Sequence, residues 1–329
     1  MNSSPSSRRV LLVSFIVDVF DVVSNLVVAL LTGSAVVFAE MAQGIADSTG
    51  SALLVIGERR SRRPADAKHP FGYARESFFW GLLSAIAMLF IGAGLSAWRG
   101  YQQLAHPEPL DSPLLAMAVV ALAVLTNSYA VRLSVRKLVE DHGNLQNAFR
   151  SMDEPLVKSA LLRDVIGTFT SVVGVIALVL YQSLDLIYFD ALGALAAAVL
   201  MTAASLALIA QARALITGQA LPKDTVKKLR TVILAIPGVD AVNRLAAVYT
   251  GTSEVLVDVD LDLDETLDTV LIEALLDEIE KRIHVALPDT DIVRVDLNSP
   301  EPGDRPGSYG EKESGSKRDF RNADDGRGP

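Results

Sequence analysis

The chain of 329 residues contains no cysteine and only four histidines. Without cysteine there can be no disulfides, iron–sulfur clusters or thiolate metal sites. None of the histidines lies within a long apolar run, so a metal site inside such a run would depend on oxygen ligands. The chain also lacks a basic patch, which argues against a nucleic-acid partner. We expect neither a nucleic-acid ligand nor a resident cofactor.

Long apolar runs are what the chain has in abundance, since half of its residues are hydrophobic. About 20 consecutive apolar residues are enough to cross a bilayer. Six runs reach this length, at residues 10–31, 38–58, 77–98, 113–133, 155–182 and 190–215. They predict an α-helical membrane protein with a six-transmembrane-helix bundle over residues 10–217. The first run has no small-residue cleavage site, so we expect a spanning helix there and not a signal peptide.

The second run carries three polar residues, Glu40, Gln43 and Asp47. Residues four apart share a helix face, so Gln43 and Asp47 point the same way. A carboxylate within the hydrocarbon costs about 2.5–3.5 kcal/mol on insertion scales, so it normally faces a cavity, a partner or an ion. We interpret this helix as half of an ion site. The alternative is that Asp47 only hydrogen-bonds a neighbouring helix.

Two other runs carry polar residues at helical spacing. In the fifth run Asp164 and Thr168 are four apart, as Gln43 and Asp47 are in the second. The first run contains a stripe made of Asp18, Asp21 and Asn25. The stripe is consistent with a water or proton path, or equally with hydrogen bonds between helices.

The distribution of charge predicts how the bundle is oriented. Lysine and arginine gather in residues 1–9, in the loop after the second run and in the loop after the fourth. By the positive-inside rule these segments and both termini are cytoplasmic. We expect residues 1–9 to form a short cytoplasmic tail. The compact loops suggest a prokaryotic plasma membrane.

From residue 221 the composition becomes that of a soluble domain. Helical periodicity and strict alternation predict, in order, a helix, two strands, a helix and a strand, at residues 224–234, 239–249, 254–264, 267–287 and 291–297. This α-β-β-α-β order over residues 221–299 predicts a small open-faced α+β sandwich.

The second predicted strand of this domain has an acidic face, in which four aspartates alternate with valine and leucine: Asp258, Asp260, Asp262 and Asp264. We expect this face to be solvated; the alternative is that it binds cations. Residues 300–329 are glycine, serine, proline and charge with few apolar residues, and we expect them to be disordered.

The loop at residues 62–76 reads Arg-Arg-Pro-Ala-Asp-Ala-Lys-His-Pro-Phe-Gly-Tyr-Ala-Arg-Glu. It resembles the Pro-Ala-Asp-x-x-His-Pro-Phe-Gly-Tyr-Gly-Arg signature of the cation diffusion facilitator family, with Ala74 where glycine is usual. The Thr32-Gly33-Ser34 turn before a polar second helix fits the same family. The resemblance covers residues 10–298. It implies a homodimeric exporter of divalent metal ions in exchange for protons, with six membrane helices and a ferredoxin-like cytoplasmic domain.

The resemblance also implies a transport site. In zinc-transporting members, helices two and five each supply a His-x-x-x-Asp or Asp-x-x-x-Asp pair. Asp47 and Asp164 match one carboxylate in each helix, while Gln43 and Thr168 stand at the other two positions. Residues 161–164 resemble the branch that contains the human zinc transporter 9. The implied site has only oxygen ligands, which suit Mn²⁺ or Fe²⁺ at least as well as Zn²⁺.

A second, weaker metal site is implied in the loop. In some relatives this loop binds zinc through an Asp-x-x-His-x-x-x-His pattern. Asp66 and His69 match its first two positions, but Tyr73 replaces the last histidine. A structural role for His69 is the alternative. In the C-terminal domain only His284 is available for a regulatory metal.

Taken together, these patterns predict a divalent metal cation efflux transporter and not an enzyme. Metal and protons would compete for Asp47 and Asp164, which would couple metal exit to proton entry. The alternative function is a metal-sensing membrane scaffold with little or no transport.

Overall fold

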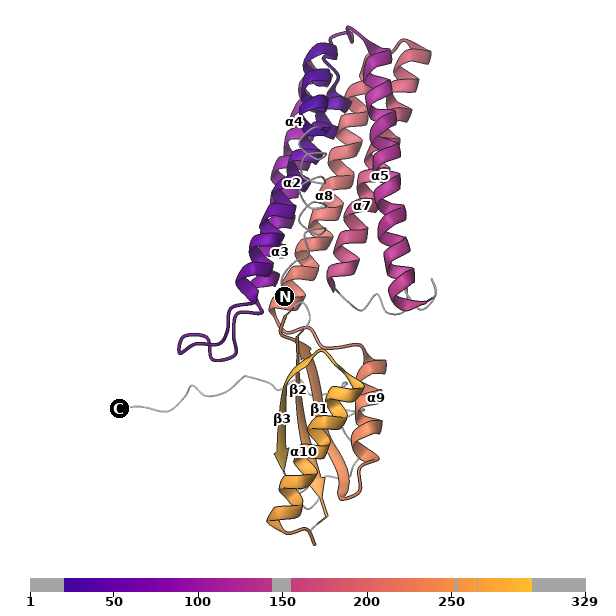
Figure 1. The fold of residues 1–329 in the computed structure, drawn as a ribbon. Helices are drawn as coiled ribbons and strands as arrows, with labels where there is room; N and C mark the ends of the chain where they lie inside the picture. The colour runs from indigo at the N-terminus through magenta and orange to yellow at the C-terminus, as the bar shows by residue number, and fades with distance from the viewer. Residues whose placement is uncertain (1–20, 144–154, 252–253, 265, 298–329) are drawn as a thin grey trace, which may run out of the picture. The chain divides into compact units, whose positions relative to one another are not determined.

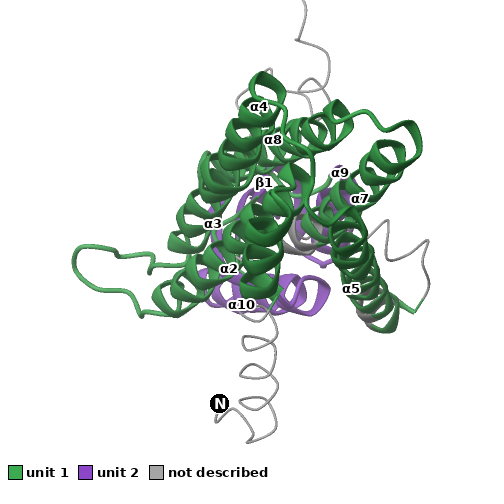
Figure 2. Ribbon diagram, turned by 90° about the horizontal axis from the view of Figure 1, so that it is seen from above, with its two compact units in different colours: residues 1–222, 248–255 green, residues 223–247, 256–329 purple. Residues whose placement is uncertain are grey.

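The computed structural model describes residues 21–143, 155–251, 254–264 and 266–297. Two compact units divide the chain, one of residues up to 222 together with 248–255, the other of the remainder (Figure 2). The tails predicted at residues 1–9 and 300–329, and Asp18 of the predicted polar stripe, lie outside the described residues.

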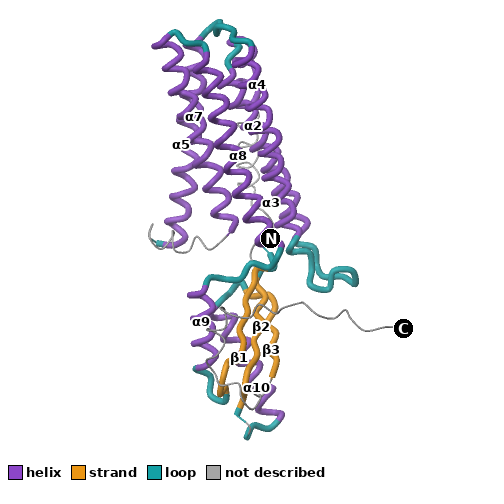
Figure 3. The backbone as a smooth tube through the Cα atoms, turned by 180° about the vertical axis from the view of Figure 1, so that it is seen from behind, coloured by secondary structure: helices purple, strands orange, loops and turns teal. Residues whose placement is uncertain are grey.

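The first unit is helical over most of its described residues (Figures 1 and 3). A helix at Asp21–Thr32 precedes α2 (Ala35–Ser61), α3 (Glu76–Ala87), η1 (Met88–Gly94), α4 (Leu95–Ala105), α5 (Pro113–His142), α7 (Pro155–Leu184) and α8 (Tyr188–Ile216). The segment η1 is a π-helical stretch that joins α3 and α4 into one helix, Glu76–Ala105. In the bundle, α7 packs against both α5 and α8 (Figure 1).

Among the described residues, four helices are long and apolar enough to cross a membrane: Glu76–Ala105, Pro113–Arg136, Leu161–Leu184 and Tyr188–Ile216. They correspond to the third, fourth, fifth and sixth predicted runs. The first run is described only from Asp21 onward. At about 1.5 Å per residue the 27-residue α2 is about 40 Å long, but its polar residues make it less apolar than the other four. The six-helix count therefore remains a prediction.

Alanines make up most of one buried cluster in the helical unit, and large apolar residues lie exposed on its outside. Ala194 and Met201 of α8 belong to a buried cluster with alanines of α2 and α3. Phe90, Leu125 and Val199 are each about 70% exposed. Small residues allow membrane helices to approach closely. An apolar exterior around such a core is what a bundle surrounded by lipid requires.

The helix α2 begins at a buried polar cap. Ser34 is its N-cap, and the Ser34 hydroxyl accepts a hydrogen bond from the backbone N–H of Val37 (3.3 Å). The same hydroxyl donates to Oδ1 of Asp190 in the first turn of α8 (2.6 Å). The Asp190 carboxylate also accepts from the backbone N–H groups of Ala35 (2.7 Å) and Val36 (3.2 Å). These N–H groups have no partner within the helix, so Asp190 satisfies them and fixes the start of α2 against α8.

The C-terminal region contains α9 (Lys223–Leu234), β1 (Val239–Tyr249), β2 (Val255–Leu263), α10 (Thr269–Ala286) and β3 (Thr290–Leu297). The three strands form one sheet in the order β1-β2-β3. The predicted α-β-β-α-β order is confirmed. Val257 and Leu261 of β2 are fully buried, as are Ile233 of α9 and Ile279 of α10. The alternating apolar residues of β2 therefore form its core face, as expected for a half-buried strand.

Candidate functional site

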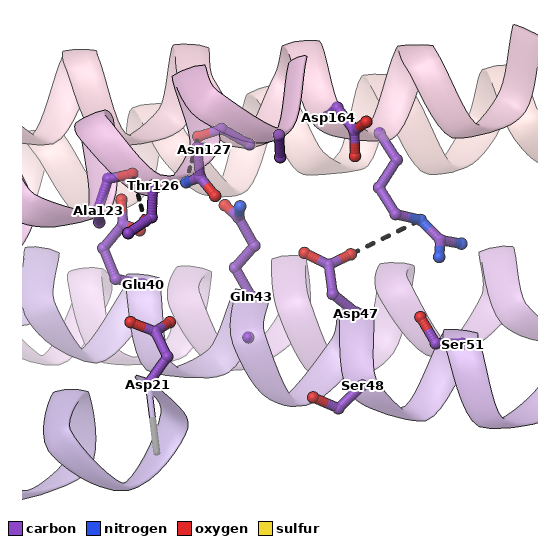
Figure 4. Close-up of a pocket in the computed structure, with 14 residues that line it drawn as sticks. Asp21, Glu40, Gln43, Asp47, Ser48, Ser51, Ala123, Thr126, Asn127 and Asp164 are labelled. Carbon is purple, nitrogen blue, oxygen red and sulfur yellow. Dashed lines mark hydrogen bonds and ion pairs between the residues drawn. The ribbon is translucent and has the colours of Figure 1, made fainter. Parts of the chain in front are cut away.

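A cavity of about 210 Å³ lies between α2, α5 and α7 (Figure 4). Three of the four residues predicted for the transport site, Gln43, Asp47 and Asp164, line this cavity. The other lining residues are Asp21, Glu40, Gly44, Ser48, Ser51, Ala123, Thr126, Asn127, Ala130, Arg163 and Gly167. Side chains from separate helices thus meet at one oxygen-rich cavity inside the helical unit.

Helical spacing aligns the polar residues of α2. Glu40, Gln43 and Asp47 lie three and four residues apart, and Figure 4 shows their side chains directed toward the facing helices that carry Asn127 and Asp164. This matches the shared helix face that their spacing predicts. Glu40 and Gln43 are both buried.

The Gln43 amide is fixed by contacts with α7. Its Oε1 accepts a hydrogen bond from the hydroxyl of Thr170 (2.5 Å). A Cβ atom at Gly167 would lie only 2.9 Å from Nε2 of Gln43. Real Cβ atoms are rarely found so close to a neighbour, so a glycine at 167 gives the amide room beside α7.

Asp164 is held by α5, and Thr168 lies beside the cavity and not in its lining. The hydroxyl of Ser134 donates to Oδ2 of Asp164 (2.5 Å). The hydroxyl of Thr168 donates to the backbone carbonyl of Asp164 (3.0 Å), four residues earlier in the same helix. Threonine commonly makes this bond within helices. Thr170, two residues further on, makes the contact with α2 instead, and Thr168 as a metal ligand stays a prediction.

Glu40 and Asn127 extend the polar surface of the cavity. The hydroxyl of Ser171 donates to Oε2 of Glu40 (3.1 Å), and Nδ2 of Asn127 donates to that hydroxyl (2.9 Å). Asp21 of the predicted polar stripe also lines the cavity, and its Oδ2 accepts from Nδ2 of Asn25 (3.2 Å). Sequence analysis identifies Glu40, Asp21 and Asn25 as polar residues in apolar runs, but it does not predict that Glu40 and Asp21 line one cavity.

Sequence analysis did not anticipate a basic residue in the cavity. Nε of Arg163 lies 3.6 Å from Oδ1 of Asp47. A terminal nitrogen of the same guanidinium donates to the hydroxyl of Ser84 on α3 (2.8 Å). In the part of the chain that the structure describes, three or more histidine, aspartate and glutamate side chains do not gather at one point that could hold a metal ion. The cavity combines carboxylates with neutral oxygens and one guanidinium.

In the loop after α2, Asp66 organises the backbone. Its Oδ1 accepts from the backbone N–H groups of Lys68 (2.9 Å) and His69 (2.8 Å), and its Oδ2 accepts from the Tyr73 hydroxyl (2.8 Å). The Tyr73 hydrogen bond, followed by the bond from His69, holds the pKa of Asp66 below its usual range. The His69 and Tyr73 rings lie 4.1 Å apart, centre to centre. This arrangement supports the structural interpretation of the loop, and the weak Asp66–His69 metal site stays a prediction.

The acidic face of β2 has partners on the neighbouring strand. Arg244 of β1 forms a salt bridge with Asp258 (2.5 Å), and Nδ2 of Asn243 donates to Oδ1 of Asp260 (3.4 Å). Asp264 accepts from the backbone N–H and the hydroxyl of Thr266, which lowers the pKa of its carboxyl group. These pairs favour a solvated, internally compensated face over a cation site.

Comparison with known proteins gives two matches that together cover most of the chain. Residues 11–216 match the cation efflux transmembrane domain, and residues 221–295 match the cytoplasmic domain of cation efflux proteins. The chain belongs to the cation efflux family. This confirms the resemblance to cation diffusion facilitators, and the chain is a multi-pass membrane protein.

Individual relatives of this cation efflux chain share about a quarter of its residues. The mitochondrial proton-coupled zinc antiporter SLC30A9 of Xenopus laevis is 26% identical over 261 residues, which cover 78% of the chain and 46% of the relative. The human SLC30A9 protein is 23% identical over 277 residues, 80% of the chain and 49% of the relative. The cation-efflux pump FieF of Cronobacter sakazakii is 25% identical over 266 residues, 80% of the chain and 83% of the relative. The chain therefore spans about half the length of the SLC30A9 proteins.

Proposed function

We propose that this cation efflux protein exports a divalent metal cation through the cavity lined by Gln43, Asp47 and Asp164. The proposal rests on one observation, namely that carboxylates of α2 and α7, far apart in the sequence, line the same cavity. A carboxylate at membrane depth normally serves an ion, a partner or a water-filled path. Membership in the cation efflux family supports the first of these roles.

We further propose that metal leaves in exchange for protons. A divalent cation relieves repulsion between Asp47 and Asp164, and protonation relieves it as well. Metal and protons thus compete for the same oxygens, and alternating access to the two sides would couple their movements. The similarity to proteins named as proton-coupled zinc antiporters supports this exchange.

The proposed ligands are oxygens only. Carboxylate and carbonyl oxygens suit Mn²⁺ and Fe²⁺, while zinc also binds carboxylates. The named zinc antiporters among the relatives support Zn²⁺ as cargo as well. We therefore propose Mn²⁺, Fe²⁺ or Zn²⁺ as the transported ion. Asn127, whose amide shares the cavity, is an additional neutral group within it.

We propose that the working form is a homodimer in a lipid bilayer, with both termini cytoplasmic. The match of residues 221–295 to the cytoplasmic domain of cation efflux proteins supports this orientation. A prokaryotic plasma membrane fits the bacterial FieF relative, most of whose length the chain covers. The SLC30A9 relatives are named as mitochondrial.

The test is metal uptake by the purified protein in liposomes that hold a pH gradient. Mn²⁺, Fe²⁺, Zn²⁺, Co²⁺ and Mg²⁺ are compared side by side for the wild type, Asp47→Asn and Asp164→Asn. Asp111→Asn is the matched control, because Asp111 is exposed and does not line the cavity. We expect uptake of at least one ion that either cavity variant abolishes and the control retains. Undiminished uptake in a variant that carries both Asp47→Asn and Asp164→Asn would disprove the site.

The same experiment distinguishes the alternative function. A sensing scaffold would bind metal without moving it, so the wild type would show no uptake of any ion. The pairing of Asp258 with Arg244 and of Asp260 with Asn243 argues against a vacant cation site on β2. Transport is therefore the function that the described residues support best.

A further inference from the structure

We propose that Arg163 is a resident cation of the cavity, whose guanidinium competes with the transported metal for Asp47. This inference rests on the proposed function and deepens it. It makes Arg163 a residue that sets metal affinity and release, acting through Asp47 without itself binding the metal. In the metal-free protein the guanidinium neutralises Asp47, and an entering divalent cation displaces it.

The contact between the two side chains is close but is not a hydrogen bond. Nε of Arg163 and Oδ1 of Asp47 are 3.6 Å apart, within range of an ion pair. A hydrogen bond requires a shorter distance. The hydrogen bond of the guanidinium goes to the hydroxyl of Ser84 instead (2.8 Å). The guanidinium is thus anchored by Ser84 and contacts Asp47 as an ion pair, from which another cation can displace it.

The helix α2 makes room for the guanidinium. A Cβ atom at Gly50 would lie 3.3 Å from both terminal nitrogens of Arg163 and 2.6 Å from the Ser84 hydroxyl. Gly50 is buried and lies one helical turn after Asp47. The guanidinium packs against the backbone of Gly50, where any larger residue would crowd it. The absence of a side chain at Gly50 therefore leaves space for the guanidinium beside the Asp47 carboxylate.

Burial makes the competition strong. The Arg163 side chain is 18% exposed and the Asp47 side chain 34%. Charges in such partly buried positions interact more strongly than in water, because the surroundings screen them less. A divalent ion on Asp47 must displace the guanidinium and stays near its positive charge, which weakens the binding of the ion and speeds its release. Arg163 thereby limits how long the metal stays in the cavity.

Two other acidic residues that line the cavity, Asp164 and Glu40, have hydroxyl partners and leave this competition in place. Oδ2 of Asp164 accepts from Ser134, and Oε2 of Glu40 accepts from Ser171. The described contacts of the guanidinium are with Asp47 and Ser84. A metal ion bound by both Asp47 and Asp164 contacts two carboxylates, whereas the guanidinium contacts only Asp47. This difference allows a divalent ion to displace the guanidinium.

The test measures metal binding and transport for full-length Arg163→Gln and Arg163→Lys. Calorimetry in detergent with Mn²⁺ and Zn²⁺ gives Kd, and proteoliposomes give KM and kcat separately. We expect Arg163→Gln to lower Kd and KM by about tenfold and to lower kcat as well, because the repulsion is gone and release slows. Arg163→Lys keeps the charge and should stay within about threefold of the wild type. Arg62→Gln, at an exposed arginine that pairs with Glu58, is the control.

Ser84→Ala provides a second test that leaves the charge in place. It removes the hydrogen bond that anchors the guanidinium, so metal should displace the guanidinium more easily and the Kd for metal should fall about threefold. If Arg163→Gln does not fold, this variant decides the matter. Unchanged or weaker metal binding in folded Arg163→Gln, or unchanged or weaker binding in Ser84→Ala, would overturn the proposal. Failure of the proposed function looks different, because the wild type would then show no metal binding that depends on Asp47.

Discussion

The hydroxyl of Ser34 lies 2.6 Å from Oδ1 of Asp190, and both residues are completely buried. The pair joins the residue that caps α2 to the first turn of α8. Because α2 carries Gln43 and Asp47, this bond helps to set the position of the helix that supplies half of the proposed site. The site therefore depends on a buried contact outside the cavity.

We expect Asp190→Ala to destabilise the protein. The backbone N–H groups of Ala35 and Val36 would lose their acceptor, and each unsatisfied buried group costs about 1–3 kcal/mol. Asp190→Asn retains one acceptor oxygen and should cost less. Thermal unfolding in detergent, followed by size-exclusion chromatography, measures the change in Tm. A Tm for Asp190→Ala equal to that of Asp111→Asn would show that the cap contributes nothing.

Gln43→His tests whether the ligand type sets ion preference. Imidazole nitrogen favours zinc over manganese more than an amide oxygen does. We expect the ratio of Zn²⁺ to Mn²⁺ uptake to rise by about tenfold, since one neutral oxygen is replaced by a nitrogen ligand. Gln43→Ala, which removes the ligand without replacing it, is the control. An unchanged ratio would mean that Gln43 does not contact the ion.

Thr170→Val and Thr168→Val form a matched pair on α7. Thr170 fixes the oxygen of Gln43, whereas the hydroxyl of Thr168 bonds to its own helix. We expect Thr170→Val to lower metal uptake about fivefold, because Gln43 loses the hydrogen bond that orients its amide. Thr168→Val should have the smaller effect. A larger loss in Thr168→Val would support Thr168 as the fourth ligand that sequence analysis predicts.

The loop after α2 should loosen in acid. The pKa of Asp66 is lowered in the folded loop by the hydrogen bonds from Tyr73 and His69, so its ionised form is the one that stabilises the loop. This stabilisation is complete above the unfolded pKa of about 3.9 and is lost as the pH falls through the lower folded value. We expect Asp66→Asn to speed amide exchange in residues 64–75 at pH 6. The difference between wild type and variant should shrink as the pH falls below about 3.9, measured by mass spectrometry at each pH; a constant difference would rule out this explanation.

Much of the fold follows from patterns along the chain. The apolar runs predict α5, α7 and α8 because each run is long enough to span a bilayer, and the alternation in residues 254–264 predicts β2. Helical spacing also predicts that Gln43 and Asp47 share a face. Such features depend on local periodicity, which a sequence displays directly.

What the sequence does not reveal depends on contacts between distant residues. Arg163 reads as a charge near the start of an apolar run, yet its guanidinium lies beside Asp47. Asp190 reads as the first acidic residue of a helix, and its role in capping α2 is not visible. Thr168 has the expected spacing from Asp164, but a threonine four residues after a carbonyl can satisfy its hydroxyl within the helix, and here it does.

The Ser34–Asp190 contact also gives α2 a fixed end from which to pivot. At about 1.5 Å per residue, Asp47 lies about 20 Å from Ser34, and Ser61 about 40 Å. If α2 tilts about that end, Ser61 travels about twice as far as Asp47. A small shift of the carboxylate that accompanies metal binding would thus be doubled at the far end of the helix, where Arg59 and Arg60 lie. Because the cap lies at one end of α2, a tilt of the helix about this end moves its other end further than it moves Asp47.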